Sequence, residues 1–254
     1  MMRLAALLAC IAGPVTADCR QALALGLDVS GSVDAREYAL QINGLAGALL
    51  DPEVRAVLLD QPEAPISLAV YEWSGPENQA LLVPWTSITD EAALFGAVAR
   101  LQSAQRQNGA LTTAIGSALR TGFDLLDQRS DCLTLTLDIS GDGPSNTGPR
   151  PQDVAHSGPR PITVNGLVIG TSDTNGDARL AEIKELSSYY TAYVIRGFGA
   201  FVETALGFED YETAMRRKLL RELTSLAIGA GPEPDSAPAL TAPATLPVIR
   251  VSAD

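Results

Sequence analysis

Three short segments of this chain concentrate side chains that carry oxygen atoms. They are Asp28-Val-Ser30-Gly-Ser32, the run from Gly109 to Gly116 that contains Thr113, and Asp138-Ile-Ser140-Gly-Asp142-Gly143. Hydroxyl and carboxylate oxygens are hard ligands that suit Mg²⁺, Mn²⁺ or Ca²⁺ better than zinc or copper. The 254 residues include one histidine and three cysteines, too few for a His- or Cys-rich zinc site. The segments therefore predict a divalent-cation site built from oxygen.

Each of these segments stands beside an element that can hold it in place. The apolar run 22–28 predicts a buried strand, 133–138 predicts a second one, and residues 113–126 have helical spacing. In an open parallel sheet, the loops that follow the strands converge at the carboxyl edge, where ligands bind. We therefore expect the three oxygen-rich segments to meet there.

The remaining elements predict an α/β fold: a Rossmann-like open, mostly parallel sheet with helices on both faces. Strands at 66–73 and 80–85 form a hairpin that adds one antiparallel edge strand. After the first strand, Ser32-Val-Asp34 offers the N-cap of a helix in which Tyr38, Ile42, Leu45 and Leu49 recur at helical spacing. A further strand is expected at 162–169, short extended pieces at 193–195 and 200–204, and helices at 90–101, 178–188 and 208–226. The last helix is expected to place Arg216, Arg217 and Lys218 on its solvated side.

Composition excludes several functional classes. Lys and Arg number 18 against 30 Asp and Glu, a net charge of −12, so a nucleic-acid binder or a protein that docks on anionic lipid is not expected. With 46% hydrophobic residues the chain is too apolar to be disordered.

The two ends of the chain differ from its middle. Residues 1–17 have a basic start, an apolar run and small residues before Asp18, which predicts a signal peptide cleaved after Ala17. The run is too short for a membrane anchor, and Cys10 is poorly placed for a lipoprotein. Residues 18–228 form the expected domain, and the Pro- and Ala-rich residues 229–254 a flexible tail. The mature protein is expected to be periplasmic or secreted.

The motifs, in this order, resemble a von Willebrand factor type A domain and its metal-ion-dependent adhesion site. The resemblance rests on Asp-x-Ser-x-Ser, on Thr113-x-x-Gly, and on the Asp-Gly pair after the fourth strand, and it spans residues 18–227. The segments DVSGSVD, DISGDGPSN, TVNGLVI and FEDYETAMRRKLLREL are similar to a branch of secreted bacterial A-like proteins of unknown function.

The resemblance assigns roles to five residues. It implies that Ser30, Ser32 and Thr113 bind Mg²⁺, Mn²⁺ or Ca²⁺ through their hydroxyls, while Asp28 and Asp142 hold it mostly through water. One open position would then accept a carboxylate from a protein or glycan partner. Neutral hydroxyls next to the cation would leave it electrophilic, which agrees with that role.

The cysteines fit the same framework. Once the leader is removed, Cys19 and Cys132 remain, and an even count in an exported protein suggests one disulfide, with two buried thiols as the alternative. In A-type domains the strands that carry them are neighbours, which is compatible with a bridge.

Plainer interpretations remain open for the site residues. Ser30 and Ser32 could cap the next helix, and Asp142 with Gly143 could form an ordinary turn. Asp138 is expected to support the site or to be buried near the strand end, not to be a ligand.

We expect first a binding module, not an enzyme. The alternative is a metal-dependent hydrolase that acts on phosphate or ester substrates. A third possibility is an inert scaffold without a ligand. The chain has no Gly-x-Ser-x-Gly motif, no credible Ser/His/Asp set and no paired metal ligands. His156 is expected at the surface. The segment 173–177 resembles a calcium loop only weakly, because position twelve would be Lys184.

Overall fold

The computed structural model describes residues 19–106, 110–171 and 176–229, with side chains as far as Thr224. It contains one sheet of order β3-β2-β1-β4-β5-β6, in which β3 alone runs antiparallel to its neighbour. The strands are β1 (Cys19–Asp28), β2 (Ile66–Trp73), β3 (Gln79–Ile88), β4 (Cys132–Gly141), β5 (Ile162–Ile169) and β6 (Val202–Ala205). The α-helices are α1 (Ala35–Leu50), α2 (Pro52–Leu58), α3 (Glu91–Gln102), α4 (Ile115–Leu126), α5 (Asp177–Tyr193) and α6 (Tyr211–Gly229).

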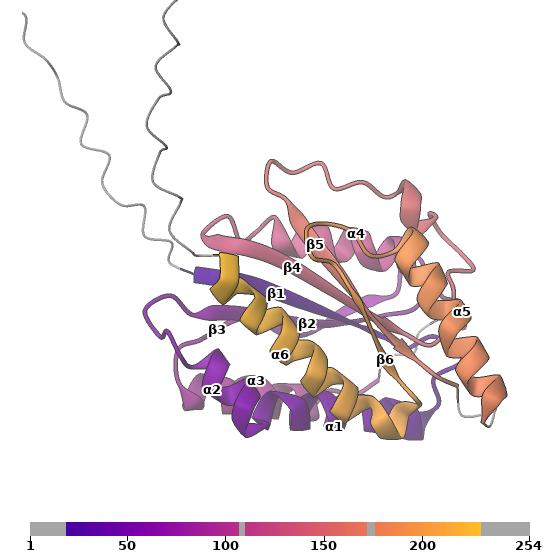
Figure 1. Ribbon diagram of the computed structural model, residues 1–254, viewed down its shortest axis with the longest axis horizontal. Helices are drawn as coiled ribbons and strands as arrows, with labels where there is room; N and C mark the ends of the chain where they lie inside the picture. The colour runs from indigo at the N-terminus through magenta and orange to yellow at the C-terminus, as the bar shows by residue number, and fades with distance from the viewer. Residues whose placement is uncertain (1–18, 107–109, 172–175, 230–254) are drawn as a thin grey trace, which may run out of the picture.

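Helices cover both faces of the sheet (Figure 1). Helices α1, α2, α3 and α6 pack on one face, and α4 and α5 on the other. The alternation in β1 explains the division: Leu23 and Leu25 belong to the first core, whereas Ala22 and Ala24 belong to the second. The predicted fold class, with its antiparallel edge strand, is confirmed.

Some element boundaries differ from the prediction. Helix α5 runs to Tyr193, beyond the expected residue 188, so no strand forms at 193–195. Helix α2 was not expected; it begins at Pro52, with the Asp51 side chain accepting from the amides of Glu53 and Val54. Its seven residues are too few for a periodic apolar pattern to stand out.

A buried ion pair joins α6 to the middle of the sheet. Lys218 is 0% exposed, and its Nζ lies 2.8 Å from Asp138 Oδ2 on β4. Glu222, one turn further along α6, also pairs with Lys218 and accepts a 2.7 Å hydrogen bond from Asn165. The expectation of a solvated Lys218 is therefore wrong, because the carboxylates of Asp138 and Glu222 require a buried cation. Burial raises the pKa of Asp138 to about 7, against the lowering effect of Lys218.

The two arginines that precede Lys218 on α6 lie at the surface, as predicted. Arg216 and Arg217 remain at the surface, where they pair with Glu53 and Glu203.

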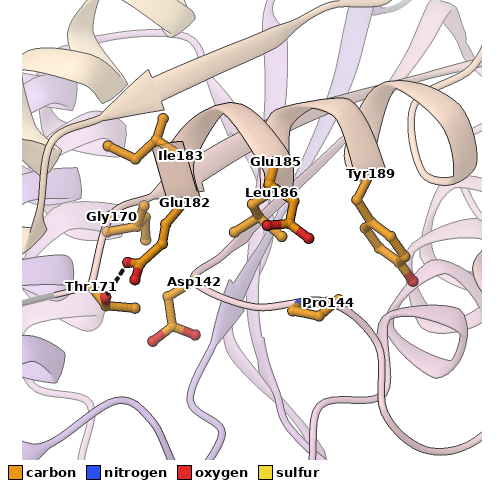
Figure 2. A pocket seen from close by; sticks show the side chains of 10 residues that line it. Asp142, Pro144, Gly170, Thr171, Glu182, Ile183, Glu185, Leu186 and Tyr189 are labelled. Atoms are coloured by element: carbon orange, nitrogen blue, oxygen red, sulfur yellow. Dashed lines mark hydrogen bonds between the residues drawn. The ribbon is translucent and has the colours of Figure 1, made fainter. Parts of the chain in front are cut away.

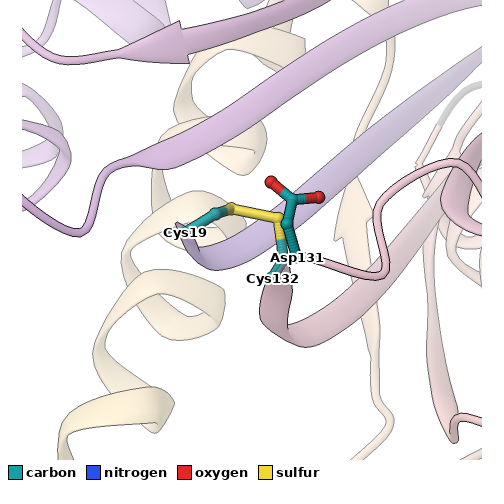
Figure 3. A group of neighbouring side chains, drawn as sticks. All are labelled: Cys19, Asp131 and Cys132. Carbon is teal, nitrogen blue, oxygen red and sulfur yellow. A yellow bond between two sulfur atoms is a disulfide. The ribbon is translucent and has the colours of Figure 1, made fainter. Parts of the chain in front are cut away.

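Cys19 and Cys132 form a disulfide between β1 and β4 (Figure 3). They are register partners, with Cα atoms 4.3 Å apart, and the bridge lies at the ends of the strands opposite the oxygen-rich loops. Asp131 lies beside it, but its carboxylate pairs with Arg129 at 2.6 Å. With both sulfurs bonded to each other, this group has no thiolate to offer a metal.

Several predictions fall on residues outside the described parts of the chain. They are the leader 1–17, nearly all of the tail 229–254, and most of the calcium-like segment 173–177. Among the helices of the described residues, none is both long enough and apolar enough to cross a bilayer.

Candidate metal centre

The three oxygen-rich loops meet at the carboxyl edge of the sheet. Ser32 Oγ donates to Asp142 Oδ1 at 2.8 Å and lies 3.2 Å from Ser30 Oγ. Thr113 Oγ1 donates to Ser30 Oγ at 3.3 Å, and the Ser30 amide donates to Asp28 Oδ1 at 2.8 Å. These contacts join Ser30 to Thr113, 83 positions away, and Ser32 to Asp142, 110 positions away, so all five predicted residues lie in one continuous cluster.

Helix capping does not occupy these hydroxyls. The cap of α1 is Asp34, which accepts from the Glu37 amide at 2.8 Å, while the Glu37 carboxylate accepts from the Asp34 amide. Helix α4 begins after Ala114 and has no side-chain cap. The capping alternative for Ser30 and Ser32 is therefore wrong, and both hydroxyls face the cluster.

Residues that sequence reasoning missed hold the loops in place. Gln41 on α1 donates to the Asp28 carbonyl at 2.9 Å, and Arg106 donates to the carbonyls of Val29 and Ser30 at 3.0 and 3.1 Å. A polar Gln41 at a core-facing position of an apolar helix was a usable signal. Arg106 lies in a loop without periodicity and offered none.

The loop that carries Asp142 is hydrogen-bonded to the segment that carries Thr113. Asn146, four residues beyond Asp142, accepts a 2.9 Å hydrogen bond from the Thr113 amide through its side chain and donates its own amide to the Thr113 carbonyl at 2.9 Å. The position of the Thr113 hydroxyl is therefore tied to the loop that carries Asp142.

The electrostatics of the cluster disfavour its own negative charges. Asp28 is 1% exposed, and burial, followed by the charge of Asp142, raises its pKa to about 8 against the hydrogen bonds from Ser30. Burial also raises the pKa of Asp142, opposed by the Ser32 hydroxyl. Asp28 Oδ2 is buried without a hydrogen-bond partner, as is the hydroxyl of Tyr190. A buried acceptor in this state is costly, and a cation would relieve it.

The residues present fit a hard divalent cation. The cluster contributes three hydroxyls and two carboxylates, with one carboxylate oxygen unsatisfied, and this donor set suits Mg²⁺, Mn²⁺ or Ca²⁺. Ser32 is exposed, and Leu111, whose carbonyl accepts from the Gly31 amide, is 84% exposed. The cluster is therefore reachable from solvent on the Ser32 side.

The single histidine lies away from this cluster. His156 Nε2 is 2.8 Å from Asp127, which follows the last turn of α4, whereas the cluster lies at the first turn. The imidazole is only 12% exposed and lies against the Phe123 ring in a tilted arrangement, with the ring centroids 5.2 Å apart, so it is less accessible than the sequence suggested.

Comparison with known proteins adds a family and a fold. The family described as "Protein of unknown function (DUF1194)" matches residues 18–227. No curated protein matches the sequence. Among solved structures, proximal thread matrix protein 1 from the mussel byssus, with a zinc-occupied MIDAS motif, is 19% identical with a TM-score of 0.53, covering 83% of this chain and 48% of that one.

Two further solved structures are similar. The pilus adhesin SpaC from Lactobacillus rhamnosus GG is 11% identical with a TM-score of 0.54, covering 82% of this chain and 31% of that chain. A von Willebrand factor type A protein from Catenulispora acidiphila is 13% identical with a TM-score of 0.49, covering 82% of this chain and 43% of that chain. The chain thus spans half or less of these proteins. The byssus matrix protein and the pilus adhesin, with TM-scores above 0.5, confirm the resemblance to the von Willebrand A fold, and at these identities the likeness concerns the fold alone.

Proposed function

The chain belongs to the DUF1194 family and has the von Willebrand A fold, and on that premise we propose that it is a divalent-metal-dependent binding module. In this proposal, Ser30, Ser32 and Thr113 hold a cation through their hydroxyls, and Asp28 and Asp142 hold it mostly through water. The cation supplies an open coordination position for an acidic group of a protein or glycan partner.

The observation that carries the proposal is the state of Asp28. Its carboxylate is buried, faces a second carboxylate, and has one oxygen without a hydrogen-bond partner. Buried polar atoms without a hydrogen-bond partner are rare in native proteins, and a bound ligand would supply the missing partner here. The zinc-occupied MIDAS motif of the byssus matrix protein supports a cation as that ligand.

Binding is favoured over hydrolysis by what surrounds the cluster. A metal-assisted hydrolase needs a base to activate water. His156 is engaged with Asp127 at the far end of α4, and the two site carboxylates are committed to the cation in this proposal. One similar structure is named a thread matrix protein and another a pilus adhesin, and these names support a non-enzymatic role.

The place of action proposed is the periplasm or the cell exterior. The leader-like residues 1–17, the Cys19–Cys132 disulfide and the extracellular character of the pilus adhesin support it. Mass spectrometry of the protein from its native host is expected to find Asp18 at the N-terminus. Recovery of the chain from the cytosol with Met1 retained would contradict export.

The direct test uses calorimetry and matched peptides. Mg²⁺, Mn²⁺ and Ca²⁺ are titrated into the wild type and into Asp28→Asn, and we expect one cation per wild-type chain and none in the variant. Immobilised peptides that carry a central aspartate are then compared with the same peptides carrying asparagine. Capture should require both the aspartate and the cation. Absence of cation binding would remove the metal claim, and equal capture with chelator would remove the mechanism.

A further inference from the structure

A pocket of about 370 Å³ opens directly beside the candidate metal centre, between the ends of β4 and β5 and the middle of α5 (Figure 2). It shares Asp142 with the metal centre. A partner group held at the cation would therefore stand at the pocket's rim. Its other lining residues are Pro144, Ile169, Gly170, Thr171, Glu182, Ile183, Glu185, Leu186 and Tyr189.

The walls of this pocket are of two kinds. Ile183 and Leu186 are buried and, with Tyr189, form an apolar side along α5. Glu182 and Glu185 lie on the exposed side of the same helix, and in Figure 2 both extend toward the loop that carries Asp142. The pocket is therefore apolar along one wall and acidic at its opening.

A hydrogen bond from outside α5 fixes one of the two glutamates at the opening of the pocket. Thr171 Oγ1 at the end of β5 donates to Glu182 Oε2 at 3.1 Å, which holds that carboxylate at the rim. Lys184, between the two glutamates in the sequence, is not one of the residues that line the pocket. No lysine or arginine is among the described residues that line it.

We infer that this pocket receives a lysine or arginine side chain of the same partner whose carboxylate is captured at the metal centre. The inference rests on the proposed function. A basic side chain has an apolar stem that can pack on Leu186 and Tyr189 while its charged end reaches Glu182 and Glu185. The partner thus presents an acidic and a basic residue close together.

Other occupants match the pocket less well. An apolar side chain would desolvate the rim carboxylates without pairing them, and an acidic one would be repelled by Glu182, Glu185 and the overall charge of −12. The volume is near the lower limit for ligand pockets, which suits one long side chain rather than a helix or strand of the partner.

The test uses short synthetic peptides with a fixed aspartate and one varied neighbour at each position, immobilised and probed with full-length protein in Mg²⁺. We expect peptides with lysine or arginine at one defined offset from the aspartate to be enriched. The variants Glu182→Gln and Glu185→Gln should each reduce that preference by about threefold to fivefold. Glu182→Lys combined with Glu185→Lys should reverse it toward acidic neighbours.

The control is Asp124→Asn, which removes an exposed carboxylate from the far end of α4. It should leave the preference unchanged, and melting temperatures should show that all variants fold. Metal-dependent capture without a basic preference, or a preference that survives the glutamine variants, would overturn this inference alone. If no aspartate peptide is captured although calorimetry shows cation binding, the carboxylate-capture function fails and this inference fails with it.

Discussion

Replacing Asp28 by asparagine should change the stability of the protein in opposite directions with and without a cation. Asparagine keeps the oxygen that accepts from the Ser30 amide and removes the charge that faces Asp142. In the metal-free wild type, a buried acid with a pKa of about 8, against 3.8 when exposed, costs on the order of 4 kcal/mol at pH 7. The new amide group, left unpaired, costs about 1–3 kcal/mol in return.

The metal-free variant should therefore be about 1–3 kcal/mol more stable than the metal-free wild type, which raises its melting temperature by roughly 2–10 °C. With a cation at about 100 times its Kd, the wild type gains about 2.7 kcal/mol and the variant gains nothing. Thermal melts in chelator and in saturating Mg²⁺ measure both differences, with Asp124→Asn as the control that should show neither.

The pH dependence has a definite sign. Because the folded-state pKa of Asp28 is raised, the metal-free wild type loses stability as pH rises from about 4 to about 8, while the variant lacks this loss. The advantage of the variant in chelator should therefore widen with pH and level off above about 8. A variant that melts below the wild type in chelator would show that Asp28 is already compensated. A retained Mg²⁺ increment would show that Asp28 does not hold the cation.

Three further results are expected. Thr113→Val should weaken cation affinity by about tenfold or more in calorimetry, since it removes one oxygen at nearly constant shape; unchanged affinity would exclude its hydroxyl. Lys218→Met should lower the free energy of unfolding, measured with urea, by about 3–5 kcal/mol, because it leaves the buried carboxylates of Asp138 and Glu222 without their cation. The loss should be smaller at acid pH, where these carboxylates take up protons. A loss below about 1 kcal/mol would contradict the buried pair. Replacing Cys19 and Cys132 together by serine should cost about 4–5 kcal/mol in the same assay; equal midpoints before and after reduction of the wild type would argue against the bridge.

The candidate site could be predicted because its residues follow strand ends. Asp28, Ser30 and Ser32 come straight after an apolar run, and parallel sheets bring such ends to one edge. The sequence could not reveal how the loops are braced. Arg106 and Asn146 act through backbone groups of distant segments, and neither lies in a periodic pattern.

The fold was predictable for a similar reason, with one instructive exception. Long apolar strands and the helices between them have clear periods, so the alternation of strands and helices along the chain and the antiparallel edge strand were expected. Lys218 was misplaced because three consecutive basic residues suggest a solvated helix face. Its partner Asp138 lies eighty residues earlier, on a central strand, and no local pattern reports such a pairing.

The disulfide has a consequence for how the site can be assembled at all. In a hairpin the turn fixes the register of the two strands. Strands β1 and β4 are parallel, and their bonded cysteines are 113 positions apart in the chain, so no turn joins them and side-chain packing must select their register. A slip of one residue in β1 would exchange its two faces, so that Leu23 and Leu25 would enter the core that now holds Ala22 and Ala24, and it would move Asp28 relative to the loop of Asp142. The covalent bond at the opposite end admits a single alignment. An oxidised chain that unfolds and refolds is thereby steered back to a competent site, whereas a reduced chain is free to sample the misaligned ones.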